Sequence, residues 1–153
     1  MAEFLIASYQ NDVVAGRTSA DRVTGETGGT DRIDLRAGDD HADLTQIVEY
    51  DVYSVYDEDY GQYFEYTEFS HMGPRFTGIL EGGSGSDTLE VSLEADPAWE
   101  SAFGYGPFSL RGTKLSGFEH LILNCDVEIS MAQLKLFETI SHEPGGSLGF
   151  ELF

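Results

Sequence analysis

Apolar residues recur along the first third of the chain in step with aspartates. Each aspartate is followed two positions later by an apolar residue, and the pairs are Asp12 with Val14, Asp21 with Val23, Asp31 with Ile33 and Asp40 with Ala42. Residues typical of turns precede each aspartate. Because the spacing stays at nine or ten residues, the pattern predicts repeated units, each a turn followed by a short strand with one inward side chain.

A fifth unit lies further along the chain, where residues 82–90 read GGSGSDTLE. Asp87 and Leu89 stand in the same relation as the earlier pairs, and paired glycines precede them. Nine residues upstream, Gly73–Gly78 followed by Leu80 predicts a sixth turn that lacks an aspartate.

Residues 44–72 predict a long β-hairpin, because apolar and polar residues alternate on both sides of a turn at Asp57–Gly61. Six tyrosines fall between Tyr50 and Tyr66 among acidic residues. They could form an exposed face that stacks on sugar rings or docks a partner. They could instead pair across the strands and cover the rest of the domain, which is the more ordinary arrangement.

The remaining sequence predicts shorter elements. The aromatic residues of 95–114 stand among glycine and proline, which predicts an irregular loop folded onto the strands. Residues 115–129 predict two or three short strands. Met131–Ile140 has the spacing of a short helix that Ser130 could cap, and the alternation in Ser147–Phe153 predicts a final strand or cap.

The 153 residues fit a single domain, residues 1–153. Their net charge indicates which kinds of molecule the protein is expected to bind. Against 28 acidic residues there are 8 lysines and arginines, for a net charge of -20. Such a surface repels nucleic acid and anionic lipid and attracts cations, so we expect no nucleic-acid partner. No apolar run reaches the length of a membrane span, so we expect no membrane insertion.

The sequence also argues against several other classes of protein. A single cysteine, Cys125, excludes an internal disulfide. We find no nucleophile elbow, zinc-protease, CxxC, phosphate-loop or dinucleotide motif, so we expect no enzymatic activity. Met1–Ile6 is too short and too acidic to be a signal peptide.

Gly82–Glu90 matches the pattern GGxGxDxUx at every specified position. With the phase of the four earlier units, this segment resembles the RTX (hemolysin-type) family of calcium-binding nonapeptide repeats over residues 7–43 and 73–93. The resemblance implies an all-β fold, a short right-handed parallel β-roll with the hairpin 44–72 inserted and a short C-terminal helix. Two units would form one coil of about 18 residues.

In that family, Ca²⁺ lies between turns one coil apart and takes carbonyl oxygens and aspartate carboxylates as ligands. The resemblance therefore pairs Asp12 with Asp31 and Asp21 with Asp40, and pairs Asp40 with Asp87 if the hairpin is looped out. Both early separations are 19 residues, which predicts a bulge near Thr24–Gly25. The implied metal-ligating positions are Asp12, Asp21, Asp31, Asp40 and Asp87, with the turn residues Gly16, Thr18, Glu26, Gly28, Leu35, Ala37, Gly82 and Ser84.

The resemblance implies a secreted module that is exported without an N-terminal signal and folds on Ca²⁺ outside the cell. One alternative is an adhesin or polysaccharide-binding module that uses the tyrosine-rich hairpin on a polysaccharide or cell-surface partner. Another is a non-catalytic accessory domain of a secreted hydrolase.

Overall fold

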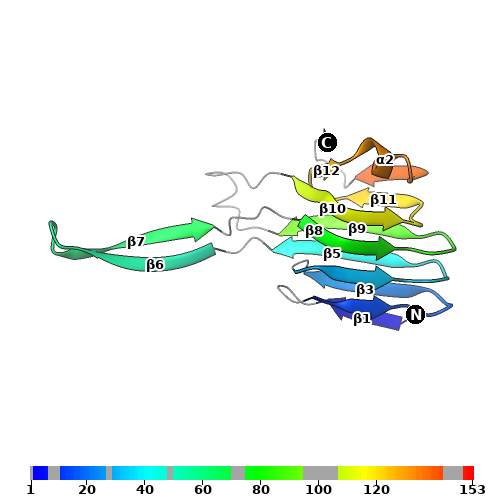
Figure 1. Ribbon diagram of the computed structural model, residues 1–153, viewed down its shortest axis with the longest axis horizontal. Coiled ribbons are helices and arrows are strands. Elements are labelled where there is room, and N and C mark those ends of the chain that lie inside the picture. The colour runs from blue at the N-terminus through cyan, green and yellow to red at the C-terminus, as the bar shows by residue number, and fades with distance from the viewer. Residues whose placement is uncertain are drawn as a thin grey trace.

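The computed structural model describes residues 2–6, 11–26, 29–47, 50–69, 75–94, 107–142 and 150–153. Over these residues the fold is mostly β, with two parallel sheets of six strands each, one antiparallel hairpin and one short helix (Figure 1). The first sheet has the order β1 (Ala2–Ile6), β3 (Asp21–Glu26), β5 (His41–Ile47), β9 (Thr88–Glu94), β11 (His120–Leu123), β13 (Thr139–His142). The second has the order β2 (Val13–Ala15), β4 (Asp31–Asp34), β8 (Arg75–Glu81), β10 (Phe108–Ser116), β12 (Val127–Ile129), β14 (Phe150–Leu152).

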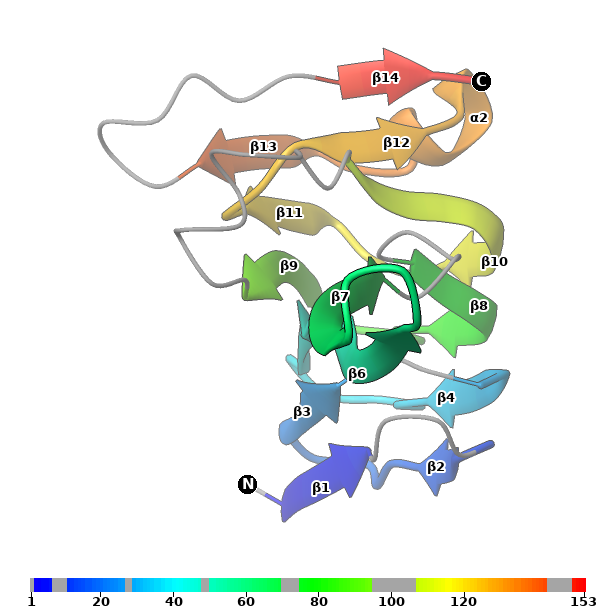
Figure 2. The ribbon, with the colours of Figure 1, turned by 90° about the vertical axis from the view of Figure 1, so that its left-hand side faces the viewer.

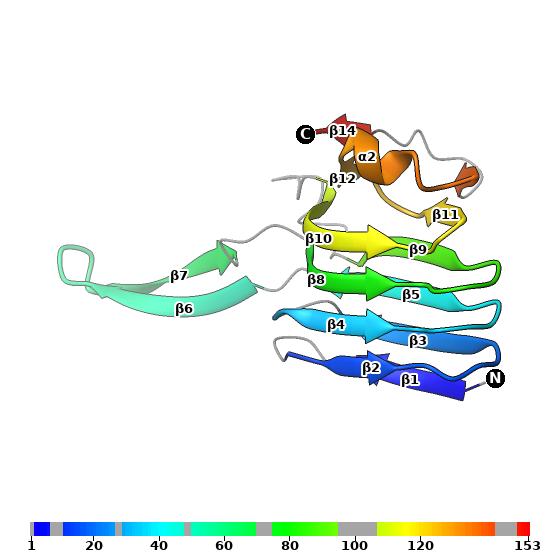
Figure 3. The same cartoon turned by 45° about the vertical axis from the view of Figure 1, so that its right-hand side comes forward.

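Outside the hairpin, the chain alternates between the two sheets, so that consecutive strands lie in opposite sheets. Every strand pairs in parallel with the strands that precede and follow it in its own sheet, and the sheets face each other along the whole stack (Figures 2 and 3). The short turns that lead from the second sheet to the first lie at one edge of this stack. The connections that lead back lie at the other edge, where the hairpin is inserted.

The register keeps one phase through the whole repeat region. Val13 lies opposite Arg32, and Arg22 lies opposite His41, so both sheets repeat with an offset of 19 residues. Across the hairpin, Ile33 lies opposite Leu80, and Ala42 lies opposite Leu89, again with one shared offset of 47 residues. The insertion therefore leaves the stacking of the turns intact, and the prediction that residues 82–87 stack on the turn before Asp40 is confirmed.

The core fills the space between the two sheets. The apolar residue two positions after each repeat aspartate points inward, as predicted; Val14 is 8% exposed and Val23, Ile33, Ala42 and Leu89 are fully buried. Parallel pairing places these side chains in rows, for example Val23, Ala42, Leu89 and Leu121. Each layer therefore buries its apolar residues against the layers above and below it.

Three predictions from the sequence about the limits and irregularities of the strands are wrong. The hairpin insertion does not begin at residue 44, because Leu44 to Ile47 continue β5 alongside β9. The predicted bulge at Thr24–Gly25 is absent, because β3 pairs with β5 without a shift from Arg22 to Glu26. Gly78, predicted to lie in a turn, lies within β8 opposite Asp31.

The predicted loop 95–114 is wrong over residues 108–114, which belong to β10, because Phe108 and Leu110 alternate inward and are fully buried. Trp99, Phe103 and Tyr105 lie outside the described residues. The helix α2 (Met131–Leu134) is shorter than predicted, although Ser130 does cap it in a capping box with Gln133. No helix in the described ranges is long and apolar enough to cross a membrane. The predicted final strand is present as β14.

The hairpin consists of β6 (Tyr50–Asp57) and β7 (Gln62–Phe69), which pair only with each other and point away from both sheets (Figures 1 and 2). The predicted turn at Asp57–Gly61 is confirmed. Tyr56 and Tyr63 pair across the strands with ring centroids 5.0 Å apart. The expectation that these aromatics cover the rest of the domain is wrong for the tyrosines whose side chains are described, Tyr56, Tyr60, Tyr63 and Tyr66, because all four are exposed.

The separation of the hairpin from the sheets yields a first prediction. Replacing residues 50–69 by a short Gly-Ser linker should leave the two sheets folded, because no sheet hydrogen bond is lost and shortening a loop changes closure entropy by about 1 kcal/mol or less. Far-UV circular dichroism and thermal unfolding would check this. Loss of cooperative unfolding in the shortened chain would show that the hairpin supports the sheets.

Candidate metal centre

The structure arranges the predicted aspartates in two columns. Asp21, Asp40 and Asp87 stand at or just before the first residues of β3, β5 and β9 and form what we call the turn-edge column. Asp12 and Asp31 stand in the same way at β2 and β4, on the edge of the stack that carries the hairpin. The three pairings expected from the sequence are therefore present as neighbours in space.

Hydrogen bonds link the members of each column from one layer to the next. Oδ1 of Asp40 accepts the backbone N–H of Asp21 at 2.6 Å, and Oδ1 of Asp87 accepts that of Asp40 at 2.8 Å. In the second column, Oδ1 of Asp31 accepts the N–H of Asp12 at 2.9 Å. Each carboxylate thus fastens its turn to the previous layer, a structural role that does not require a metal.

Sequence reasoning missed the next member of the turn-edge column, Glu119. Its Oε2 accepts the N–H of Asp87 at 2.8 Å, so it takes the position of an aspartate in the following layer. Leu121, two positions later, is buried in the same row as Leu89. The spacing of an acidic residue two positions before an apolar one could have identified Glu119. The search for aspartates at a nine-residue period missed it, because Glu119 is a glutamate and lies 32 residues after Asp87.

The turns before these aspartates pack backbone against backbone. Ala37 bridges to Ser84, the N–H of Gly38 donates to the Ser84 carbonyl at 3.0 Å, and the N–H of Ser84 donates to the Arg36 carbonyl at 2.9 Å. A Cβ added to Gly85, whose φ is 147°, would lie 1.7 Å from the Gly38 carbonyl oxygen. Only glycine fits this approach, which stacks the carbonyl groups of neighbouring turns.

The predicted turn ligands occupy equivalent places in this stack. Gly16, Leu35 and Gly82 each begin a turn, and Thr18, Ala37 and Ser84 follow two residues later. Glu26 ends β3 at the edge that carries Asp31, and Gly28 lies outside the described residues.

Two carboxylate oxygens in the turn-edge column have no hydrogen-bond partner. Asp40 is 2% exposed and Asp87 is fully buried, and Oδ2 of each is out of contact with solvent and accepts no hydrogen bond. Oδ2 of Asp21 differs, because it accepts the N–H of Arg17 in its own turn. A buried carboxylate oxygen without a donor or cation costs several kcal/mol. The ionised side chains of Asp40 and Asp87 are therefore destabilised where they lie.

Burial raises the pKa values of Asp31, Asp40 and Asp87. Loss of solvation raises the pKa of Asp31 to about 6 and also raises the pKa values of Asp40 and Asp87, although a backbone hydrogen bond opposes each rise. Repulsion adds to the shift, from Asp12 at Asp31 and from Asp40, Glu119 and Asp39 at Asp87. At neutral pH, these side chains therefore repel one another in a poorly solvated place.

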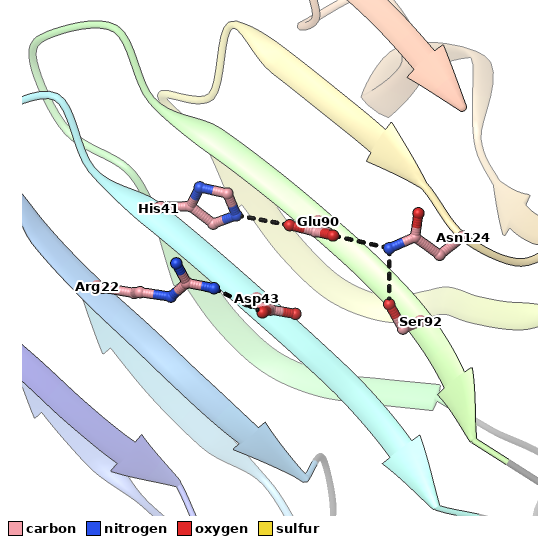
Figure 4. Close-up of polar contacts among 6 residues, drawn as sticks. All are labelled: Arg22, His41, Asp43, Glu90, Ser92 and Asn124. Carbon is pink, nitrogen blue, oxygen red and sulfur yellow. Dashed lines mark hydrogen bonds and ion pairs between the residues drawn. The ribbon is translucent and has the colours of Figure 1, made fainter. Parts of the chain in front are cut away.

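The outer face of the first sheet shows the contrasting case, in which acidic residues have partners (Figure 4). Asp43 forms an ion pair with Arg22 at 3.0 Å. Glu90 contacts His41 at 2.8 Å and accepts a hydrogen bond from Asn124 at 2.7 Å. The chain thus supplies cationic or amide partners to outward acids, while the Oδ2 atoms of Asp40 and Asp87 receive none.

The unpartnered oxygens suit a hard cation, and calcium accepts carboxylate and carbonyl oxygens at flexible angles. Asp40 and Asp87 would supply carboxylates from adjacent layers. In the described part of the chain, no group of three or more His, Cys, Asp or Glu side chains is arranged to hold a metal. An ion at this place would therefore need turn carbonyls or water to complete its ligands.

Comparisons with known proteins returned no relative. No protein-family model, no curated protein and no solved structure matches the chain.

The raised pKa values predict that the metal-free protein becomes less stable as the pH rises. A carboxyl group whose pKa is higher in the folded state favours folding at low pH, and this contribution is lost between its unfolded pKa near 4 and its folded value near 6. Urea unfolding with chelator should therefore give a free energy of unfolding on the order of 1–2 kcal/mol higher at pH 5 than at pH 7.5. A rise in metal-free stability over this window would contradict the assignment.

Proposed function

We propose that this chain is a calcium-binding module of a secreted protein and that its paired sheets are a short right-handed β-roll. The unpartnered Oδ2 atoms of Asp40 and Asp87 are the observation that carries the proposal, because each is buried and accepts no hydrogen bond. The alternation of strands between two parallel sheets and the constant register support the β-roll assignment.

In this proposal, each of these aspartates has two roles, one for each carboxylate oxygen. Oδ1 of Asp87 holds the amide of the previous layer, and Oδ2 turns toward the ion. The stacked glycine turns bring carbonyl groups close enough to contribute further oxygens. The ion supplies positive charge, which offsets the dehydration of the carboxylates and their mutual repulsion.

This arrangement couples folding to calcium. Without the ion, buried carboxylates and the net charge of -20 oppose compaction. Because the site exists only when the turns are stacked, Ca²⁺ binds the folded chain and stabilises it by about 2.7 kcal/mol at 100 times Kd. A chain that is unfolded at low calcium can be exported in the unfolded state, and it then folds at the millimolar calcium outside cells. This behaviour is compatible with export without an N-terminal signal.

The module is proposed to be non-enzymatic. The roles of polysaccharide-binding adhesin and of accessory domain of a secreted hydrolase stay predictions, since no relative supports either.

The variant Asp87→Asn separates the two roles of that side chain. Asparagine keeps an oxygen for the N–H of Asp40 but removes the buried charge. We therefore expect the metal-free variant to be more stable than the parent, by about 1–3 kcal/mol, and to lose most of the calcium response in thermal unfolding. Circular dichroism with Ca²⁺, Mg²⁺ or chelator measures both effects.

Asp34→Asn is the matched control, because Asp34 also lies beside a turn but points outward from β4 and is partly exposed. It should respond to calcium like the parent. The proposal fails if the parent shows no calcium-dependent change, or if Asp87→Asn and Asp34→Asn respond to calcium equally.

A further inference from the structure

The β6–β7 hairpin exposes aromatic side chains that have no role in the two sheets. Tyr60 and Tyr63 are 74% and 71% exposed, and Tyr56 and Tyr66 are about half exposed. A two-stranded hairpin is marginally stable alone in water, and exposed aromatic area of this kind usually marks a binding surface. The turn-edge column lies on the opposite edge of the stack, so the hairpin is separate from the candidate metal centre.

The tip of the hairpin is held in one conformation. Oδ1 of Asp57 accepts the N–H groups of Asp59 at 2.9 Å and Tyr60 at 3.2 Å, and the Asp57 carbonyl accepts the N–H of Gly61 at 2.8 Å. Gly61 has a φ of 65°, as such a turn requires. The rings are also fixed against each other, Tyr56 on Tyr63 and Tyr60 edge-on to Phe64 at 6.0 Å. Fixed aromatic side chains lose little entropy on binding.

The charge of the hairpin is of one sign. Residues 50–69 contain six acidic residues and no lysine or arginine, namely Asp51, Asp57, Glu58, Asp59, Glu65 and Glu68. The nearest cationic residues along the chain are Arg36 and Arg75. Cross-strand pairing places Glu65 on the same face of the hairpin as Tyr56 and Tyr63, and places Asp57 on the opposite face with Tyr66. Each face therefore combines a carboxylate with exposed tyrosine, and guanidinium groups pair with carboxylates and stack on aromatic faces.

We propose that the β6–β7 hairpin is an arm that binds an arginine-rich segment or surface of another protein. Nucleic acids and acidic polysaccharides carry the wrong charge for this surface. A neutral glycan could stack on the tyrosines but would leave the exposed carboxylates of Glu58, Asp59 and Glu65 without a role. The proposal goes beyond calcium-dependent folding, since it concerns residues that contact neither column of aspartates.

The test uses the whole chain in calcium with three fluorescent peptides of equal length, rich in arginine, in lysine or in glutamine. Fluorescence anisotropy gives Kd at physiological and high salt. Because the whole protein is acidic, any basic peptide gains some affinity, and the hairpin must be isolated by variants. The arginine peptide should bind about 2–5-fold more tightly than the lysine peptide, owing to stacking on tyrosine.

Two matched pairs of substitutions locate the site. Glu58→Gln with Glu65→Gln removes two exposed charges from the hairpin, and Glu3→Gln with Glu138→Gln removes two exposed charges from β1 and from the bend before β13. The first pair should weaken arginine-peptide binding by about 3–10-fold, and the second by less than about twofold. Tyr60→Ser should abolish the preference for arginine over lysine.

The chain in which a linker replaces residues 50–69 should lose the arginine preference while its calcium response is unchanged, so this result is independent of the proposed function. Equal effects of the two glutamate pairs, or equal binding of arginine and lysine peptides, would overturn the proposal. So would binding of a neutral glycan panel that Tyr60→Ser removes, in the absence of arginine-peptide binding.

Discussion

The fold depends on carboxylates that are buried where each turn enters a strand. One oxygen of Asp40 or Asp87 receives the amide of the previous layer, which sets the height of the turn in the stack. The other oxygen has no donor, and burial raises the pKa of each side chain. The same residues therefore order the turns and oppose their formation at neutral pH, and a cation at this edge would remove the opposition.

The apolar core also requires the layers to stack in register. Inward residues from two parallel sheets form continuous rows, so each layer gains burial only when its neighbours are in register. The two sheets share an offset of 19 residues before the hairpin and of 47 residues across it, which shows that the insertion is accommodated outside the stack. A long insertion at this edge costs little, because loop closure entropy rises slowly with length. The chain can thus carry a projecting arm without disturbing the repeat.

Much of the repeat region could be predicted from the sequence, because the Asp-x-apolar spacing encodes both the turn and the inward side chain. The stacking of Asp87 on Asp40 followed from counting turns across the hairpin. The strand β10 could not be predicted in this way, since Phe108 and Leu110 alternate inward next to glycine and proline without an aspartate. Glu119 was not predicted as a member of the turn-edge column, because it is a glutamate and lies outside the nine-residue period of the aspartates. The alternation of apolar and polar residues predicts that a hairpin forms, but it does not specify in which direction the hairpin points relative to the sheets.

The most direct test of the metal assignment is a crystal structure of the chain grown with Ca²⁺, with anomalous scattering measured to identify the ion. The account predicts a calcium ion at about 2.3–2.6 Å from Oδ2 of both Asp40 and Asp87, with turn carbonyls or water completing its ligands. Density for water alone, or Oδ2 atoms that remain without a partner at saturating calcium, would contradict it.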